Sequence, residues 1–196
     1  MIPILILAAG QSSRMGGRDK LLEDVGGEPL LRKQVRMACG TGHPVFVALP
    51  ANAGARRTAI ADLAAQPLGV AEAKEGLSGT MRGAVRQLPD APAFMLILGD
   101  LVALETSDLL AVIGARERHP DNIIWRGATQ DGAPGHPIIF DRSVRPDFAN
   151  LRGDDGGKSL TGPLKDRTCL VRLPQNRARF DLDTPEEWDA WRGVNR

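Results

Sequence analysis

Short apolar runs alternate with amphipathic segments along the first half of the chain. The run at residues 2–8 is typical of a strand buried on both faces, and the runs at 45–49 and 93–98 have the same character. Between the first two runs, residues 30–39 place apolar side chains at the spacing of an amphipathic helix. This alternation of strand and helix predicts a parallel sheet joined by right-handed crossovers.

The other predicted elements extend this pattern to the end of the chain. They are a helix at 55–65, a strand at 69–73, a helix ending at Leu88, a helix at 107–118 capped by Thr106 or Ser107, strands at 123–126, 136–140 and 168–173, and a final helix through Trp191. Together they predict an α/β fold of three layers, Rossmann-like, with a mostly parallel sheet. The 196 residues suit a single domain, and no repeat or linker divides them.

A glycine-rich, cationic loop follows the first predicted strand. Residues 10–20 contain three glycines, two serines and the cations Arg14, Arg18 and Lys20. Glycines let backbone N–H groups approach anionic oxygens, and cations neutralise their charge, which favours a polyphosphate site. The spacing matches neither the P-loop nor the dinucleotide-binding glycine motif. A solvated surface loop is the alternative, but open α/β sheets bind ligands at the carboxyl ends of buried strands, where this loop lies.

This loop carries a resemblance to a known family. The sequence Leu7-Ala8-Ala9-Gly10-x-Ser12-x-Arg14-Met15-Gly16, followed by Asp19-Lys20-Leu21-Leu22, resembles the N-terminal signature of nucleotidyltransferases that act on the molybdenum cofactor. That family lies within the wider class that makes nucleoside-diphosphate sugars and related CDP or GDP compounds. Ala-Ala-Gly is similar to the cytidylyltransferase branch, whereas the guanylyltransferase branch usually reads Ala-Gly-Gly. The resemblance implies a nucleotide-binding half, about 1–105, and an acceptor-binding half, about 106–196.

The resemblance also implies which residues hold the nucleotide. They are Leu7, Ala8, Ala9, Gly10, Ser12, Arg14, Lys20 and Ser78. Arg14 and Lys20 are expected to be catalytic as well, because they would neutralise the triphosphate. Ser78 belongs to a Gly-x-Ser segment that contacts nucleotide in the family, but from the residues alone it is equally consistent with the N-cap of the following helix.

Asp100 follows the buried run at 93–98. A carboxylate in that position can hold a divalent cation that bridges nucleotide phosphates, although aspartates are also common in turns and N-caps after strands. The resembling enzymes use this Gly-Asp for magnesium, so Asp100 is expected to be both catalytic and a metal ligand. The polar residue and proline that usually follow are replaced here by Leu-Val-Ala at 101–103. The shape of the next loop should therefore differ from the family's.

Two further carboxylates, Asp181 and Asp183, come just before the last predicted helix. Alternate residues of an extended segment point to the same side, so both carboxylates can face one point. Thr184, Pro185 and Glu187 fit a capping box with proline at the first helical position. The segment resembles the family's Asp-x-Asp-Thr-Pro-Glu, in which an aspartate completes the magnesium site. The sequence leaves open which of the two aspartates that is.

On the acceptor side, the resemblance points to His136, Gly153 and Asp154 as substrate-binding residues. Gly-His-Pro at 135–137 is similar to a segment of the cytidylyltransferase branch. His136 is expected to be a substrate-side or loop-ordering residue and not a general base, since a lone histidine is more often structural. Gly153 and Asp154 lie in a charged, glycine-rich segment that matches the family loosely, and it is either a substrate lid or a solvated turn.

The charge balance argues against several other functions. The chain has 25 basic and 24 acidic residues, so no overall basic field favours nucleic acid or an anionic membrane. Tyrosine is absent and aromatic residues make up 4%, which disfavours base stacking on single strands. Cys39 and Cys169 lack metal-site spacing and are expected to be buried free thiols. Without a basic leader or a membrane-length apolar run at the N-terminus, the chain is expected to be cytoplasmic.

The reaction implied by the resemblance is nucleotidyl transfer with Mg²⁺ as cofactor. CTP would donate CMP to a phosphorylated acceptor, molybdopterin, with release of pyrophosphate, and a molybdoenzyme or its chaperone is a candidate partner. The alternatives are GTP as donor, a sugar or polyol phosphate as acceptor, and a non-catalytic chaperone that binds nucleotide or molybdopterin. An NAD-type oxidoreductase is disfavoured because the dinucleotide glycine spacing is missing.

Overall fold

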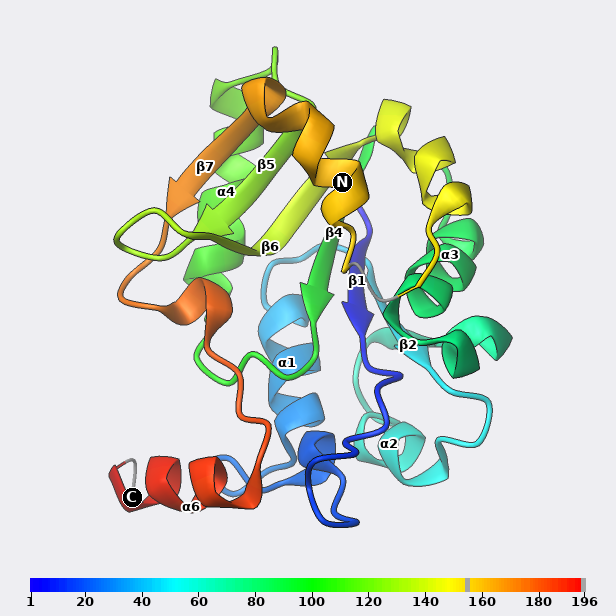
Figure 1. Ribbon diagram of the computed structural model, residues 1–196, viewed down its shortest axis with the longest axis vertical. Helices are drawn as coiled ribbons and strands as arrows, with labels where there is room; N and C mark the ends of the chain where they lie inside the picture. The colour runs from blue at the N-terminus through cyan, green and yellow to red at the C-terminus, as the bar shows by residue number, and fades with distance from the viewer. Residues whose placement is uncertain (154–155, 195–196) are drawn as a thin grey trace.

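The computed structural model describes residues 1–153 and 156–194. It is built on one seven-stranded sheet with the order β3-β2-β1-β4-β6-β5-β7 (Figure 1). The strands are β1 Ile4–Leu7, β2 Val45–Leu49, β3 Ala65–Gly69, β4 Ala93–Leu98, β5 Ile124–Ala128, β6 Pro134–Asp141 and β7 Thr168–Arg172. β6 runs antiparallel to both β4 and β5, and the other pairings of the described strands are parallel. The predicted mostly parallel sheet is therefore confirmed.

Helices connect these strands. The α-helices are α1 Leu30–Cys39, α2 Gly54–Ala59, α3 Leu77–Gln87, α4 Thr106–Arg118, α5 Lys158–Thr161 and α6 Pro185–Val194. Short 3-10 segments are η1 Lys20–Leu22, η2 Ala71–Glu75, η3 Arg142–Asn150, η4 Gly162–Arg167 and η5 Arg177–Arg179. Among the described residues, no helix is long and apolar enough to cross a membrane.

Both faces of the sheet are covered, which gives the three layers that the sequence predicts. α1 and α4 pack on one face, in a core that also contains Trp188 of α6. α3 and η3 pack on the other face, where the rings of Phe94, Phe140 and Phe148 lie within 5.6 Å of one another, centroid to centroid. Because β1 and β4 are buried on both faces, they appear in the sequence as continuous apolar runs.

The predicted boundaries are wrong between residues 54 and 75. The helix is shorter than expected and ends at Ala59, and the third strand occupies 65–69 in place of 69–73. Residues 71–75 form η2. β3 is an edge strand in which only Leu68 is buried, so the apolar run that marks the central strands is missing from it.

The predicted cap of α4 is wrong, and one of the two readings left open for Ser78, the N-cap of α3, is excluded. α4 is capped by Glu105, in a reciprocal capping box with Asp108, and neither Thr106 nor Ser107 serves as its cap. The cap of α3 is Gly76 at φ 89°, and Ser78 lies inside the helix. Cys39 and Cys169 are free thiols as predicted, but both are only half-buried.

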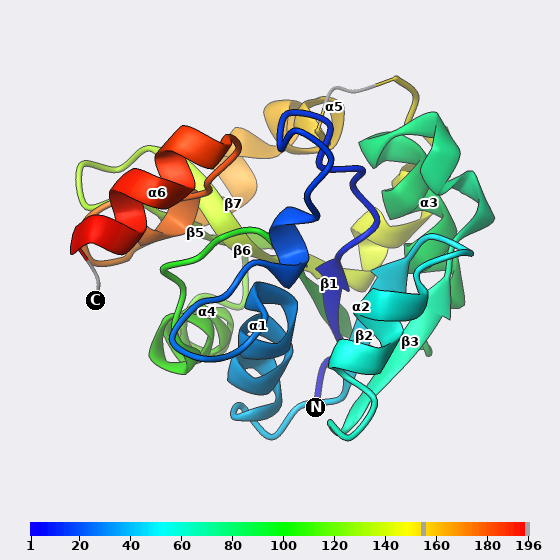
Figure 2. The ribbon, with the colours of Figure 1, turned by 90° about the horizontal axis from the view of Figure 1, so that it is seen from below.

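One edge of the sheet gathers the segments that the sequence marks as functional. β1 and β4 are parallel neighbours, so the loop after β1 and Asp100 after β4 emerge side by side. Figure 2 looks onto this edge and shows the loop after β1 lying between α3 and α6. The last helix, α6, therefore lies near the end of the first strand, β1.

Candidate active site

The loop after β1 is shaped by left-handed residues. Gly16 and Gly17 have φ values of 59° and 90°, and Ser12 has φ 52°, which is uncommon for a residue with a side chain. The Ser12 hydroxyl accepts a hydrogen bond from the backbone N–H of Lys20 at 3.2 Å. Ser12 therefore closes the loop and fixes the point at which Lys20 begins η1.

Lys20 joins three segments that are distant in the sequence. Its Nζ lies 2.5 Å from Asp100 Oδ2 and 2.8 Å from Asp183 Oδ1. Arg14 adds a second cation, with Nη2 2.7 Å from Asp183 Oδ2. Burial lowers the pKa of Lys20, but the charges and hydrogen bonds of Asp100 and Asp183 outweigh it and raise the pKa above the ordinary value. The lysine is therefore a fixed positive charge at this edge of the sheet.

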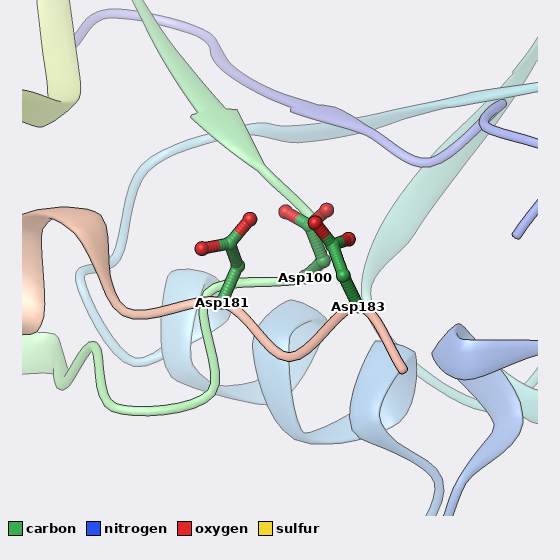
Figure 3. A group of neighbouring side chains, drawn as sticks. All are labelled: Asp100, Asp181 and Asp183. Carbon is green, nitrogen blue, oxygen red and sulfur yellow. The ribbon is translucent and has the colours of Figure 1, made fainter. Parts of the chain in front are cut away.

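Three carboxylates converge beside this lysine. Asp100, Asp181 and Asp183 each offer an oxygen, and these oxygens lie within 4.8 Å of one another (Figure 3). Oδ1 of Asp100 is buried and has no hydrogen-bond partner. Desolvation and the charges of Asp100 and Asp183 raise the pKa of Asp181. A divalent cation would give the buried Asp100 oxygen a partner and would offset the repulsion among the three carboxylates. This donor set therefore fits Mg²⁺ or Mn²⁺.

The unusual residues after Asp100 help to build this cluster. Leu101 forms an antiparallel bridge with Asp181, which fixes the third carboxylate next to the first. The buried amide of Gln34 donates to the Leu101 carbonyl at 2.8 Å, and Lys33 Nζ donates to the Val102 carbonyl at 2.7 Å. The side chains of Leu101 and Val102 lie in the core. The altered segment is thus an ordered, well-packed wall of the site.

Asp183 is held in place by the start of α6. The Glu187 carboxylate accepts hydrogen bonds from the backbone N–H groups of Asp183, at 2.7 Å, and Thr184, at 3.1 Å. The Thr184 hydroxyl accepts in turn from the Glu187 N–H at 3.3 Å. This confirms the predicted capping box, which positions one of the three carboxylates as well as starting the helix.

Arg56, on α2, clamps the loop from the other side, a role that the sequence analysis missed. Its guanidinium is buried and donates to the carbonyls of Ala8 and Gly10, both at 2.7 Å. It also binds both carboxylate oxygens of Asp19, at 2.7 and 2.9 Å. Asp19 caps η1, so the clamp reaches Lys20 through one residue. An arginine in a short helix gives no sequence signal here, because two of its four hydrogen bonds go to backbone carbonyls and the other two to a residue 37 positions away.

Two adjoining pockets lie along the loop. One, of about 630 Å³, runs between the loop and the start of α3 and reaches Lys20 and Asp100. The other, of about 550 Å³, lies between the loop and α2. They share five lining residues, namely Ala9, Gly10, Gln11, Ala73 and Lys74. The cleft therefore follows the predicted nucleotide-binding segment and reaches Asp100, with Leu7 also in its wall.

His136 lies on β6 near the same edge. One ring nitrogen, Nδ1, is 3.4 Å from the carbonyl of Leu96 on β4. Burial lowers its pKa to about 4; the Leu96 hydrogen bond and the Asp100 charge act in the opposite direction, and the charge of Arg126 adds to the lowering. The ring is therefore neutral at neutral pH. It has no carboxylate partner among the residues described, which fits the ordering role expected of it and not that of a general base.

The remaining predicted site residues lie apart from this cluster or outside the described structure. Ser78 is buried, and its hydroxyl donates to the Arg152 carbonyl at 3.3 Å, so it ties α3 to the segment before Gly153. Gly153 has φ 63°, and Asp154 lies outside the described residues. The roles proposed for these three residues, as for the nucleotide contacts of the loop, stay predictions.

A doubly wound sheet whose carboxyl edge carries a glycine-rich cationic loop and converging carboxylates is an arrangement that suits a nucleotide and a divalent cation. The chain belongs to the family of the MobA-like NTP transferase domain, whose model matches residues 4–168. The resemblance noted in the sequence is thereby confirmed at the level of the family. A comparison with curated proteins finds no match.

Solved structures support the same placement. Rv0371c from Mycobacterium tuberculosis H37Rv is 27% identical, with a TM-score of 0.81, and the match covers 99% of this chain and 97% of that one. A manganese complex of Rv0371c from M. tuberculosis is 25% identical, with a TM-score of 0.78 and 96% of both chains covered. A CMP:2-keto-3-deoxy-manno-octonic acid synthetase complexed with CTP is 14% identical, with a TM-score of 0.75 and coverage of 99% and 98%. This last likeness shows the fold alone.

Proposed function

We propose that this nucleotidyltransferase transfers CMP from CTP to a phosphorylated acceptor, molybdopterin, and releases pyrophosphate. The observation that carries the proposal is the meeting of Lys20 with Asp100 and Asp183 at the end of a cleft lined by the loop after β1. Cations for a triphosphate and ligands for a metal ion are thus gathered in one place. The reaction is assigned to the cytoplasm, as expected from the sequence.

The chemistry needs alignment and charge neutralisation more than proton transfer. An oxygen of the acceptor's terminal phosphate attacks the α-phosphorus of CTP, a new P–O bond forms, and the bond to the β-phosphate oxygen breaks so that pyrophosphate leaves with the electron pair. A phosphate nucleophile is already anionic near neutral pH, so no side chain has to remove a proton. Neutral His136 is consistent with this scheme.

Each charged residue has a proposed task. Lys20 and Arg14 neutralise the triphosphate, and the backbone N–H groups from Ala8 to Ser12 approach its oxygens. Asp100, with Asp181 and Asp183, would hold Mg²⁺, which when bound supplies positive charge at the phosphates. The manganese complex of Rv0371c supports a divalent cation in a relative of this fold. Ser78, His136, Gly153 and Asp154 are proposed to order the acceptor side.

The choice of CTP rests on two observations. The loop reads Ala8-Ala9-Gly10, which is similar to the cytidylyltransferase branch of the family, and Ala9 lines both pockets. A synthetase with the same fold has been solved with CTP. The side chain at position 9 affects how much space the cleft leaves for the base of the nucleotide. GTP, which has a larger base, is therefore the competing donor to test. Sugar and polyol phosphates are the competing acceptors.

A panel of nucleotides tests the proposal. Thermal unfolding is measured with CTP, GTP, ATP and UTP, each with and without Mg²⁺, and pyrophosphate release is measured with each nucleotide and molybdopterin. CTP with Mg²⁺ should give the largest rise in Tm and the fastest release; a ligand at 100 times its Kd stabilises by about 2.7 kcal/mol. A larger response to GTP would reassign the donor, and binding without release would favour the non-catalytic chaperone.

A further inference from the structure

The last helix, α6, buries little of its own surface. The structure describes all ten of its residues, and only Trp188 among them is buried; the others are exposed or half-buried. Asp183, one of the three carboxylates of the candidate metal site, comes two residues before Pro185, where the helix begins. A movement of α6 would therefore carry Asp183 with it, so the contacts that hold α6 in place also bear on the site.

Glu23 joins α6 to the loop after β1. Its Oε2 lies 2.5 Å from Nη2 of Arg192, which is in the last turn of α6. Its Oε1 lies 3.6 Å from Nε of Arg18, which belongs to the loop itself. The Glu23 side chain is only 12% exposed, so salt and water screen its pair with Arg192 less than they screen an ordinary surface ion pair. One carboxylate thus bridges the loop and the helix.

Other contacts fix both members of the Glu23–Arg192 pair. Glu23 is the C-cap of η1, and its backbone N–H donates to the carbonyl of Lys20 at 3.4 Å. The guanidinium of Arg192 lies over the ring of Trp188, 5.2 Å from the centroid, and its Nη1 is 3.7 Å from Oδ1 of Asp189. The pair therefore connects two positioned side chains, one directly after η1 and the other on α6.

Two sets of ion pairs link the loop region to the segment that contains α6. The first set lies inside the site and consists of Arg14 and Lys20 with Asp183, at 2.7 and 2.8 Å. The second is Glu23 with Arg192, and neither residue lines the two pockets along the loop. In the proposed function, phosphates attract Arg14 and Lys20 while the metal ion attracts Asp183, so the first set weakens as substrates bind. The second set takes part in neither interaction and is retained.

We propose that Glu23 and Arg192 are positioning residues that keep α6 docked on the loop while substrates take up the charges around Asp183. The docked helix keeps Asp183 at the place where the metal ion binds. Without the pair, α6 is held chiefly by the packing of Trp188 and Trp191. This role rests on the proposed function for the identity of the nucleotide, but its effect on metal binding can be tested alone.

The test uses Mn²⁺ as the probe, and the EPR signal of the free ion gives its Kd. Arg192→Met removes the charge and keeps an apolar contact with Trp188, and Glu23→Gln removes the charge at nearly constant size. Each should raise the Kd about fivefold, equivalent to about 1 kcal/mol. The double variant should lose no more than either single variant, because both changes break the same pair. Asp189→Asn is the matched control, since it removes the other ion pair of Arg192, within α6, and should leave the Kd unchanged.

A second comparison separates positioning from a purely structural role. Lys20→Met removes a link inside the site, as phosphates would, so in this background Arg192→Met should raise the Kd for Mn²⁺ about tenfold, more than in the wild type. Equal penalties in the two backgrounds would overturn the proposal. An unchanged Kd in both single variants, whatever their Tm, would also overturn it, and so would a double variant whose loss is the product of the single losses.

Turnover gives a third measurement. Arg192→Met should raise the Mg²⁺ concentration for half-maximal pyrophosphate release about fivefold, and saturating Mg²⁺ should restore the rate. A loss that saturating Mg²⁺ does not restore would contradict a role through Asp183 and overturn the proposal. Absence of turnover in the wild type would refute the proposed function and leave the Mn²⁺ result standing.

Discussion

Lys20 Nζ and Asp100 Oδ2 lie 2.5 Å apart, although 80 residues separate them in the sequence. The lysine is presented by η1 and the aspartate by the end of β4, so the contact exists only because β1 and β4 are neighbours in the sheet. Asp100 also belongs to the cluster that fits a divalent cation. Lysine and metal ion therefore compete for the same carboxylates, and nucleotide phosphates would relieve the competition by attracting the lysine.

Removing the lysine should strengthen metal binding in the absence of nucleotide. Lys20→Met frees Asp100 and Asp183 from their charged partner, and we expect the affinity for Mn²⁺ to rise about tenfold, equivalent to about 1.4 kcal/mol. Titration calorimetry or the EPR signal of free Mn²⁺ measures the change. Lys165→Met, on the exposed η4, is the control and should have no effect. Weaker binding in Lys20→Met would mean that the lysine helps to assemble the metal site.

The same residues should be needed for turnover. Lys20→Ala and Asp100→Ala should each lower the rate of pyrophosphate release about 10²-fold or more, the range for loss of one preorganised electrostatic group. Circular dichroism should show an intact fold, with the exposed Asp121→Ala as control. A near-normal rate in either variant would remove that residue from the mechanism.

Arg56 should stabilise the loop through Asp19. Arg56→Met leaves a carboxylate and two carbonyls without their donor, and we expect a loss of about 3 kcal/mol in the free energy of unfolding, as for other broken buried ion pairs. Urea denaturation measures it, with the neighbouring Arg57→Met as control. Because Asp19 is the partner, the double variant with Asp19→Asn should lose much less than the sum of the single changes. Additive losses would argue against the clamp.

The cap of α6 should affect both stability and the metal site. Thr184→Ala and Glu187→Ala should each lower the free energy of unfolding by about 1 kcal/mol, as for other lost N-caps. Glu187→Ala should also weaken Mn²⁺ binding, because the Glu187 carboxylate fixes the backbone of Asp183. Glu186→Ala, in the same turn and equally exposed, is the matched control. Unchanged Mn²⁺ affinity in Glu187→Ala would show that the helix cap does not contribute to metal binding.

His136 should make the protein less stable in acid. Its pKa is about 4 in the folded chain and ordinarily 6.5, so between these values the unfolded chain binds more protons. Stability should therefore fall as the pH drops from 6.5 to 4, by up to about 3 kcal/mol. Denaturant unfolding across this range should show a slope that His136→Gln removes and that His119→Gln, at an exposed position, retains. The same slope in all three proteins would assign it to other groups.

The sequence predicts those parts of the fold whose signal is local. β1, β2 and β4 are buried on both faces and so appear as apolar runs with nearly correct limits. β3, an edge strand with mostly exposed side chains, carries no such run and was misplaced by four residues, from 69–73 to 65–69. β7, the other edge strand, is predicted at 168–173 and lies at 168–172, so an edge strand is misplaced only when, like β3, it lacks an apolar run.

The residues of the candidate site also differ in whether a local sequence signal marks them. Lys20 and Asp100 stand in motifs that can be recognised along the chain, and their meeting follows from neighbouring parallel strands. The sequence could not decide between Asp181 and Asp183, whereas the structure brings both to Asp100. The bridge between Leu101 and Asp181 depends on three-dimensional packing, which no local sequence pattern reports. Arg56 was missed for the same reason, because its contacts with the Ala8 and Gly10 carbonyls and with Asp19 exist only in the folded chain.

The family match ends at residue 168, whereas Asp181, Asp183 and the core residue Trp188 come later. A recombinant fragment trimmed to the matched stretch would keep the glycine loop and Asp100 and yet lose two of the three carboxylates. It would also leave open the part of the core that Trp188 fills. Any shortened protein used for biochemistry should therefore keep the last helix, since the second and third carboxylates and part of the core come with it.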